Sequence, residues 1–161
     1  MKPGLLAAIL ALGIAAAHAA SPVDRVVVRK SDGLLQLMVG TRVVRQFPIY
    51  LGSNPIGHKR HQGDKRTPEG RYVLHERKRQ SRFYRALRIS YPNETDRTAA
   101  EAAGQLPGGD IMIHGMPALE KRSLLMFDGP NWTDGCIAIS NPHMREVWDL
   151  VELGTPIEIL P

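Results

Sequence analysis

Short apolar runs separated by turn-forming residues constrain the fold of this chain more than any other feature of its sequence. Runs of roughly four to eight apolar or β-branched residues, bounded by Gly, Pro, Asn or Asp, are typical of β-strands. Such runs recur from residue 23 onward, and we expect strands at residues 26–28, 34–39, 43–51, 71–75, 86–90, 111–114, 136–139 and 156–159. The sequence therefore predicts a mainly β fold.

Two segments interrupt the strand pattern with the signals of α-helices. Residues 93–103 are rich in Ala and Glu and begin with Asn93, a residue type that caps helix N-termini. Residues 141–153 begin with Asn141 as a candidate cap and Pro142 at the first helical position, and their apolar residues recur at helical spacing. We therefore expect two helices that pack against the β structure.

The first residues have the pattern of a secretory signal. Met1 and Lys2 precede an apolar stretch over residues 5–17, and Ala17-His18-Ala19 is a small-x-small cleavage site. The apolar stretch is too short for a membrane span, which needs about 20 residues. We expect a cleaved signal peptide over residues 1–19, no integral membrane segment in the mature protein, and a location in the periplasm or elsewhere outside the cytoplasm.

The composition excludes several classes of protein. One Cys among 161 residues rules out a disulfide scaffold, and 43% hydrophobic with 23% charged residues is typical of a globular domain. The formal net charge is +5, but the basic residues are scattered instead of forming a run, which disfavours nucleic acid as a partner. We expect a single domain over residues 23–161.

The lone Cys136 is the first candidate for chemistry. It follows the turn residues Asp134 and Gly135 and precedes an apolar strand, so its thiol lies at a loop-to-strand junction. An unpaired thiol in an exported protein is buried, paired between chains, or used as a nucleophile. The turn favours the nucleophile, because Gly135 allows close backbone approach and N–H groups at such a turn can face a developing oxyanion.

A thiol nucleophile needs a base, and histidine is the natural candidate. His114 ends an apolar strand and is followed by Gly115, a position from which a side chain reaches into a cleft, although a purely structural histidine is the alternative. A zinc site is a weaker interpretation of the same residue types, and its ligands would be His58, His61, His75 and Cys136. Basic residues lie next to these histidines, and no two ligands have the close spacing typical of a zinc site. We expect no metal and no cofactor.

These residues also resemble a known family. Ile113-His114-Gly115, followed by Thr133-Asp134-Gly135-Cys136-Ile137, is similar to the signature of the L,D-transpeptidase catalytic domain, also called YkuD. Residues 65–72 are similar to the Thr-Pro-x-Gly segment of that family, and residues 154–157 to its closing Gly-Thr-x-Val strand. The resemblance covers almost the whole of residues 23–161.

The resemblance implies a β-sandwich-like catalytic fold that acts on bacterial cell-wall peptides. In the family a Cys attacks the stem tetrapeptide between meso-diaminopimelate and D-alanine, and the acyl group then passes to an amine. By this resemblance Cys136 is the nucleophile, His114 is the base, and Gly135 with Cys136 supplies oxyanion donors. Peptidoglycan stem peptides are the expected partner.

Candidate substrate-binding residues surround this pair in the sequence. Two long polar loops, residues 52–70 and 116–131, are expected to line a cleft. The candidate residues that contact the substrate are Trp132, Thr133, Asp134, Gly115, His58 and Tyr84.

The sequence departs from the family pattern at two positions. Thr133 replaces the family's Ser and keeps a hydroxyl, whereas Ala138 replaces an Arg and loses a cation. The candidate substitutes for that cation are Lys59, Arg66, Arg82 and Arg122.

Three functions fit this pattern. The first is L,D-transpeptidation, in which an amine of a second stem accepts the acyl group. The second delivers the same acyl group to water, which makes a carboxypeptidase, or an endopeptidase that cuts stem or wall-protein links. The third, from another class, is a non-catalytic wall-binding module in which Cys136 is dispensable.

Overall fold

The computed structural model describes residues 23–117 and 131–161. The expected signal peptide, Arg122 and most of the loop at 116–131 lie outside the described residues. No helix in the described ranges is both long and apolar enough to cross a membrane.

The described residues form eight strands and two helices. In chain order the elements are β1 (Arg25–Arg29), β2 (Leu34–Val39), β3 (Arg42–Pro48), β4 (Gly70–Lys78), β5 (Ala86–Ile89), α1 (Glu94–Ala102), β6 (Met112–His114), β7 (Ile137–Ala138), α3 (Asn141–Leu150) and β8 (Pro156–Leu160). All the strands join one sheet in the order β3-β2-β1-β8-β4-β5-β6-β7. The predicted mainly β fold with two packed helices is therefore confirmed.

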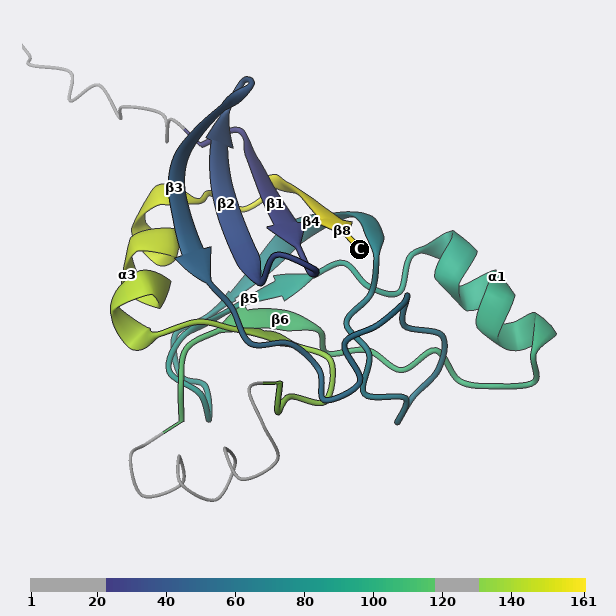
Figure 1. Cartoon of the computed structure of the whole chain (residues 1–161). Coiled ribbons are helices and arrows are strands. Elements are labelled where there is room, and N and C mark those ends of the chain that lie inside the picture. The colour runs from purple at the N-terminus through teal and green to yellow at the C-terminus, as the bar shows by residue number, and fades with distance from the viewer. Residues whose placement is uncertain (1–22, 118–130) are drawn as a thin grey trace, which may run out of the picture.

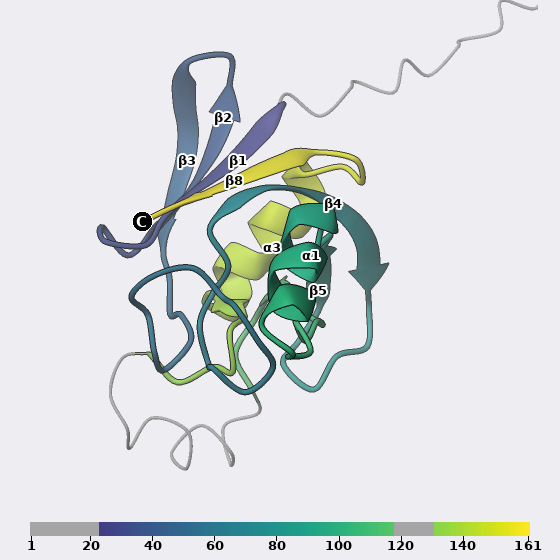
Figure 2. The same ribbon diagram turned by 90° about the vertical axis from the view of Figure 1, so that its right-hand side faces the viewer.

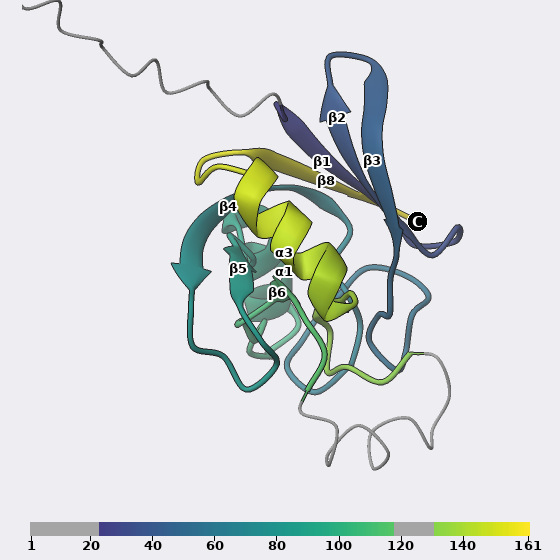
Figure 3. The ribbon, with the colours of Figure 1, turned by 90° about the vertical axis from the view of Figure 1, so that its left-hand side faces the viewer.

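The sheet bends at strand β4, which pairs with β8 along its first half and with β5 along its second half. Residues 70–73 of β4 pair with β8, while residues 74–78 pair with β5 after a register shift between Leu74 and Glu76. Such a shift bends a strand and increases its twist. As a result β1, β2 and β3 form one layer and β5 and β6 lie in another, and α3 crosses the opening between them (Figures 1 and 3).

The apolar pattern of each element explains the core. Helix α3 directs Met144, Val147 and Trp148 inward, which is the helical spacing expected from the sequence. The strands contribute alternate residues such as Leu35 and Leu37, both of which are fully buried. One contiguous core therefore supports both layers and fixes the positions of β6 and β7.

The helix caps agree with the sequence at α1 and differ at α3. Asn93 caps α1 as expected, in a reciprocal capping box with Asp96. At α3 the cap is Ser140 instead of Asn141, because the Ser140 hydroxyl accepts the His143 N–H and the Asn141 amide oxygen accepts the Met116 N–H. The helix also ends at Leu150, three residues before the expected end at 153.

The long loop between β3 and β4 is held by buried charges. Lys30 Nζ, on a side chain that is almost fully buried, donates to the Gly57 carbonyl, the Thr67 carbonyl and the Glu69 carboxylate. Lys59 pairs with Asp64 at 2.7 Å within the loop. The loop lies beside α1, so its position is fixed on two sides (Figure 2).

Candidate active site

The parallel pairing of β6 with β7 brings the thiol and the imidazole to one face of the sheet. Ile113 pairs with Ile137 and both are fully buried, so Met112 and His114 point to the opposite face. Cys136 directly precedes β7 at the level of Met112. The side chains of Cys136 and His114 consequently line the same pocket, of about 360 Å³.

The surroundings of the Cys136 thiol favour its protonated form. Its sulfur lies 3.4 Å from the Asp110 carbonyl oxygen, to which the S–H donates, and it accepts the Met112 N–H. Burial raises the pKa of the Cys136 thiol to about 11, and the Asp110 and Asp134 carboxylates add to this rise. Lys59 and the Met112 N–H act in the opposite direction and are outweighed.

The imidazole of His114 is neutral and has a defined tautomer. His114 is 3% exposed, and this burial lowers its pKa. Its Nδ1 lies 2.7 Å from the Gly115 carbonyl oxygen, an atom that can only accept a hydrogen bond. Nδ1 therefore carries the proton, and Nε2 keeps the lone pair that a general base needs.

Two aromatic rings hold the imidazole in place. Phe83 stacks on the His114 ring with centroids 4.7 Å apart, and Trp132 meets it edge-on at 5.9 Å. Trp132 was a candidate from the sequence, whereas Phe83 was missed because it lies in the β4–β5 connection, far from the motif. No local signal identifies Phe83; the pairing of β5 with β6 brings it to the site.

Thr133 organises the turn that carries Cys136. Its hydroxyl donates to the Cys136 carbonyl at 2.7 Å and accepts the Gly135 N–H at 3.1 Å. Thr133 is buried, so its side chain supports the turn from behind. The Cys136 N–H has no hydrogen-bond partner within residues 23–117 and 131–161 and is therefore free to donate to a bound group.

The backbone of the long loop crosses directly over Gly135. A Cβ atom at Gly135 would lie 2.6 Å from the Arg66 carbonyl oxygen, and its φ of 125° also disfavours any other residue. Gly115 is constrained by packing alone, since a Cβ there would lie 2.5 Å from the Asn141 amide oxygen and 3.0 Å from the Tyr84 carbonyl oxygen. A side chain at either position would therefore displace its neighbours, and at Gly135 it would also strain the backbone.

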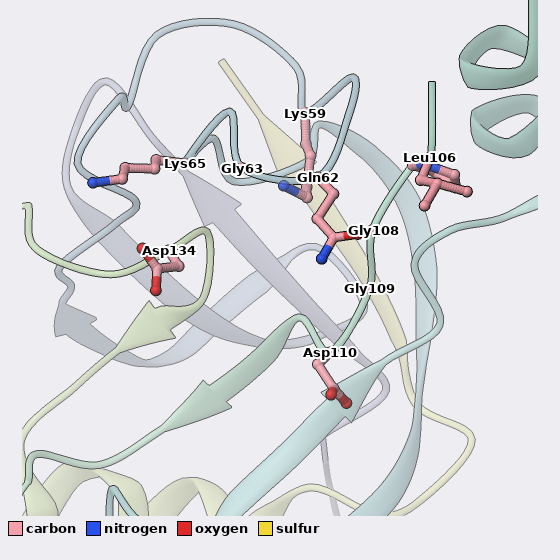
Figure 4. A pocket seen from close by; sticks show the side chains of 10 residues that line it. Lys59, Gln62, Gly63, Lys65, Leu106, Gly108, Gly109, Asp110 and Asp134 are labelled. Atoms are coloured by element: carbon pink, nitrogen blue, oxygen red, sulfur yellow. The ribbon is translucent and has the colours of Figure 1, made fainter. Parts of the chain in front are cut away.

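A second and larger cavity lies next to the pocket of Cys136 and His114. It has a volume of about 730 Å³ and shares Asp110 with the pocket of Cys136 and His114. Asp134, two residues before the nucleophile, lines it together with Lys59 and Lys65 of the long loop (Figure 4). The two cavities therefore meet at Asp110, whose carbonyl oxygen lies 3.4 Å from the Cys136 sulfur.

The remaining candidate residues lie at different distances from this site. Tyr84 is close to the base, because its carbonyl accepts the Gly115 N–H at 3.1 Å. His58 is elsewhere: its Nε2 lies 3.2 Å from Asp96 Oδ1, and it lines a separate pocket beside α1. The structure does not bring His58 to the Cys136 pocket.

The structure also shows where the residues lie that could replace the family's Arg at position 138. Ala138 is fully buried, so its own position presents no side chain to the cleft. Lys59 is engaged by Asp64, while Arg82 lines the Cys136 pocket. Arg66 lies beside Gly57.

Arg88 is a cation that the sequence analysis missed. Its guanidinium pairs with both Glu76 and Asp110, and it therefore fixes the residue whose carbonyl holds the thiol. Only the pairing of β4, β5 and β6 brings these residues together.

No group of three or more His, Cys, Asp or Glu side chains in the described ranges is arranged to hold a metal ion.

Comparison with known proteins identifies a family and a curated relative that are similar to this chain. Residues 23–159 match the family model of the L,D-transpeptidase catalytic domain, YkuD. The putative L,D-transpeptidase YafK of Escherichia coli K12 is 32% identical over 112 residues, which cover 68% of this chain and 38% of YafK. The chain spans less than half the length of this curated relative.

Solved structures agree with this match. The helical cell shape determining protein Pgp2 of Campylobacter jejuni has a TM-score of 0.66 and 27% identity over 85% of this chain and 47% of its own. Bd1075 of Bdellovibrio bacteriovorus has a TM-score of 0.59 and 25% identity over 88% of this chain and 49% of its own. On the family match, the curated relative and the shared fold, this chain belongs to the L,D-transpeptidase catalytic domain (YkuD) family.

Proposed function

We propose that this protein is an exported L,D-transpeptidase that acts on peptidoglycan stem peptides through a thioester on Cys136. The observation that carries the proposal is the shared pocket of Cys136 and His114, in which the Gly115 carbonyl leaves His114 Nε2 free to accept a proton. Membership of the family supports peptidoglycan as the substrate and a location outside the cytoplasm.

The proposed first half-reaction forms the thioester and releases D-alanine. The Cys136 thiol gives its proton to His114 Nε2 as its sulfur attacks the carbonyl of meso-diaminopimelate that is joined to D-alanine. The tetrahedral oxyanion accepts the Cys136 N–H. When the C–N bond breaks, the imidazolium returns the proton to the departing D-alanine amine.

The proposed second half-reaction transfers the acyl group. An amine of another stem attacks the thioester and gives a proton to His114, and the Cys136 thiolate leaves and is reprotonated. The two cavities share Asp110, whose carbonyl oxygen lies 3.4 Å from the sulfur, and in this proposal each cavity takes one of the two substrates, the donor or the acceptor. Pgp2 is named for determining helical cell shape, which leads us to include wall remodelling for cell shape in the proposal.

Mass spectrometry of purified protein with a disaccharide-tetrapeptide tests this function, with Cys136→Ala as the control. We expect a cross-linked dimer and loss of D-alanine with the natural protein and neither with Cys136→Ala. Tripeptide without dimer would assign the protein as a hydrolase instead. No reaction with either protein, on tetrapeptide or on cross-linked wall, would contradict an enzymatic role.

A further inference from the structure

The larger cavity beside Cys136 has a mixed lining of charges and bare backbone. It is lined by Lys59, Gln62, Gly63, Lys65, Leu106, Pro107, Gly108, Gly109, Asp110 and Asp134. Figure 4 shows that one wall comes from the long loop, another from the segment before β6, and a third from the turn before Cys136. A volume of about 730 Å³ holds a group of several heavy atoms.

Two of the four charged side chains in this cavity are already engaged. Lys59 Nζ donates to the Asp64 carboxylate at 2.7 Å and to the His61 carbonyl at 3.1 Å. The Asp110 carboxylate pairs with Arg88. These two residues therefore shape the cavity and have limited capacity to bind a further charged group.

The other two charged side chains are free to bind a ligand. Lys65 and Asp134 are exposed, and neither side chain has an ion-pair or hydrogen-bond partner in the part of the chain that the structure describes. Figure 4 shows both at the same end of the cavity, one from the long loop and one from the turn that carries the nucleophile. An ammonium and a carboxylate held this way complement a ligand that carries one group of each sign.

The opposite wall is suited to a peptide main chain. Gly108 and Gly109 present no side chains, and their N–H and carbonyl groups have no hydrogen-bond partners within the described ranges. Unpaired backbone groups at a ligand-accessible wall can pair with a peptide placed against them. The cavity thus offers backbone groups on one wall and opposite charges on another.

Resting on the function proposed above, we propose that this cavity binds the zwitterionic end of the donor diaminopimelate side chain, with Asp134 receiving its ammonium group and Lys65 its carboxylate. The carbonyl under attack and this end belong to the same residue, and the cavity shares Asp110 with the pocket of Cys136, so binding here holds the carbonyl near the sulfur. Asp134 and Lys65 are then specificity-determining residues.

The effect of Asp134 on the pKa of the Cys136 thiol is consistent with an ammonium group bound to Asp134. The Asp134 carboxylate raises the pKa of Cys136, which by itself opposes activation of the thiol. A substrate ammonium bound to Asp134 neutralises this effect at the moment when a thiolate is needed. Asp134 therefore binds the substrate, and this binding lowers the pKa of the Cys136 thiol.

The test measures D-alanine release in the first turnover, which reports acylation and needs no acceptor. Three disaccharide-tetrapeptides are compared: one with free diaminopimelate, one acetylated at its free amine, and one amidated at its free carboxylate. We expect Asp134→Asn to slow acylation about tenfold on the free stem and to change little on the acetylated stem. Lys65→Gln is expected to show the same contrast between the free and the amidated stem.

Matched variants and a second readout separate binding from misfolding. Asp32→Asn and Arg60→Gln remove the same charges from exposed side chains outside the cavity and should leave acylation unchanged. Asp134→Asn should also speed the alkylation of Cys136 by iodoacetamide at pH 8, because a charge that disfavours the thiolate is gone. A misfolded variant would not combine slower acylation with faster alkylation.

The outcomes distinguish this inference from the function on which it rests. Equal acylation of the three stems by the natural protein, unaffected by Asp134→Asn and Lys65→Gln, would overturn the inference and leave the transpeptidase proposal standing. Absence of D-alanine release from every stem by the natural protein would overturn both.

Discussion

The Nδ1 atom of His114 lies 2.7 Å from the carbonyl oxygen of Gly115, the next residue along the chain. Because a carbonyl has no proton to give, this contact selects the tautomer with hydrogen on Nδ1. The strand end and the close packing of Gly115 against Asn141 hold the two atoms together. This one contact fixes the direction in which the base accepts a proton.

The first prediction concerns that tautomer. In protein labelled with ¹⁵N-histidine, the His114 imidazole at pH 7.5 should show a protonated Nδ1 and an unprotonated Nε2. The lowered pKa of His114 keeps the ring neutral at this pH. A spectrum with the proton on Nε2 would contradict the assignment of His114 Nε2 as the base, and His114→Gln identifies the resonance.

The second prediction concerns the pH dependence of thiol reactivity. Burial raises the pKa of Cys136 to about 11, so the thiolate fraction of the free protein grows with pH up to that value. The rate of alkylation by iodoacetamide should therefore rise about tenfold per pH unit between pH 7 and 10. The measurement is the rate of mass addition to Cys136.

A plateau of that rate below pH 9 would contradict the second prediction. It would mean that the thiol ionises below pH 9, well under the raised pKa of about 11. Cys136→Ala provides the background, since Cys136 is the sole thiol of the chain.

The third prediction concerns the turn that carries the nucleophile. Thr133→Val removes the hydroxyl that joins the Gly135 N–H to the Cys136 carbonyl and leaves both groups without that partner. We expect the rate of acylation to fall about tenfold or more, because small displacements of a nucleophile are costly. The measurement is D-alanine release in the first turnover.

Thr133→Ser is the matched control for this turn. It keeps the hydroxyl and matches the Ser of the family pattern, so acylation should stay within about threefold of the natural protein. If Val and Ser at this position gave the same rate, the hydroxyl would have no positioning role.

The fourth prediction concerns the buried pair within the long loop. Burial by itself raises the pKa of Asp64, but hydrogen bonds from Lys59 and from the N–H groups of Arg60, Arg66 and His61 outweigh it and lower the pKa to about 2. Asp64→Asn leaves the Lys59 ammonium buried without its counter-charge and should cost about 3 kcal/mol of unfolding free energy at pH 7. Urea denaturation measures this change.

The sign of the pH effect at Asp64 follows from the same shift. A lowered pKa means that the carboxylate stabilises the folded state above pH 4, and that this contribution is lost as the pH falls toward 2. Asp64→Asn should remove that part of the acid sensitivity. Asp32→Asn, which breaks an exposed pair with Arg29, is the control and should cost less than about 1 kcal/mol.

The sequence by itself determined most elements of this protein and predicted Cys136 and His114 as its reactive pair. Strand positions followed from apolar runs, since alternation is a local property that survives in the fold. At α3 the local signal was ambiguous, because Ser140 and Asn141 are both good caps and the choice depended on Met116, a contact far along the chain. Cys136 and His114 were identified from their own neighbours.

Tertiary structure alone decided which distant residues join that pair. Phe83, Arg88 and Lys65 reach the site because β5 pairs with β6 and the long loop crosses over Gly135. The same structure kept His58 away from the thiol, although its loop borders the site. Sequence patterns record local preference and burial, whereas the register between strands and the path of a loop arise from packing across the whole core, and this packing determined the shape of the site.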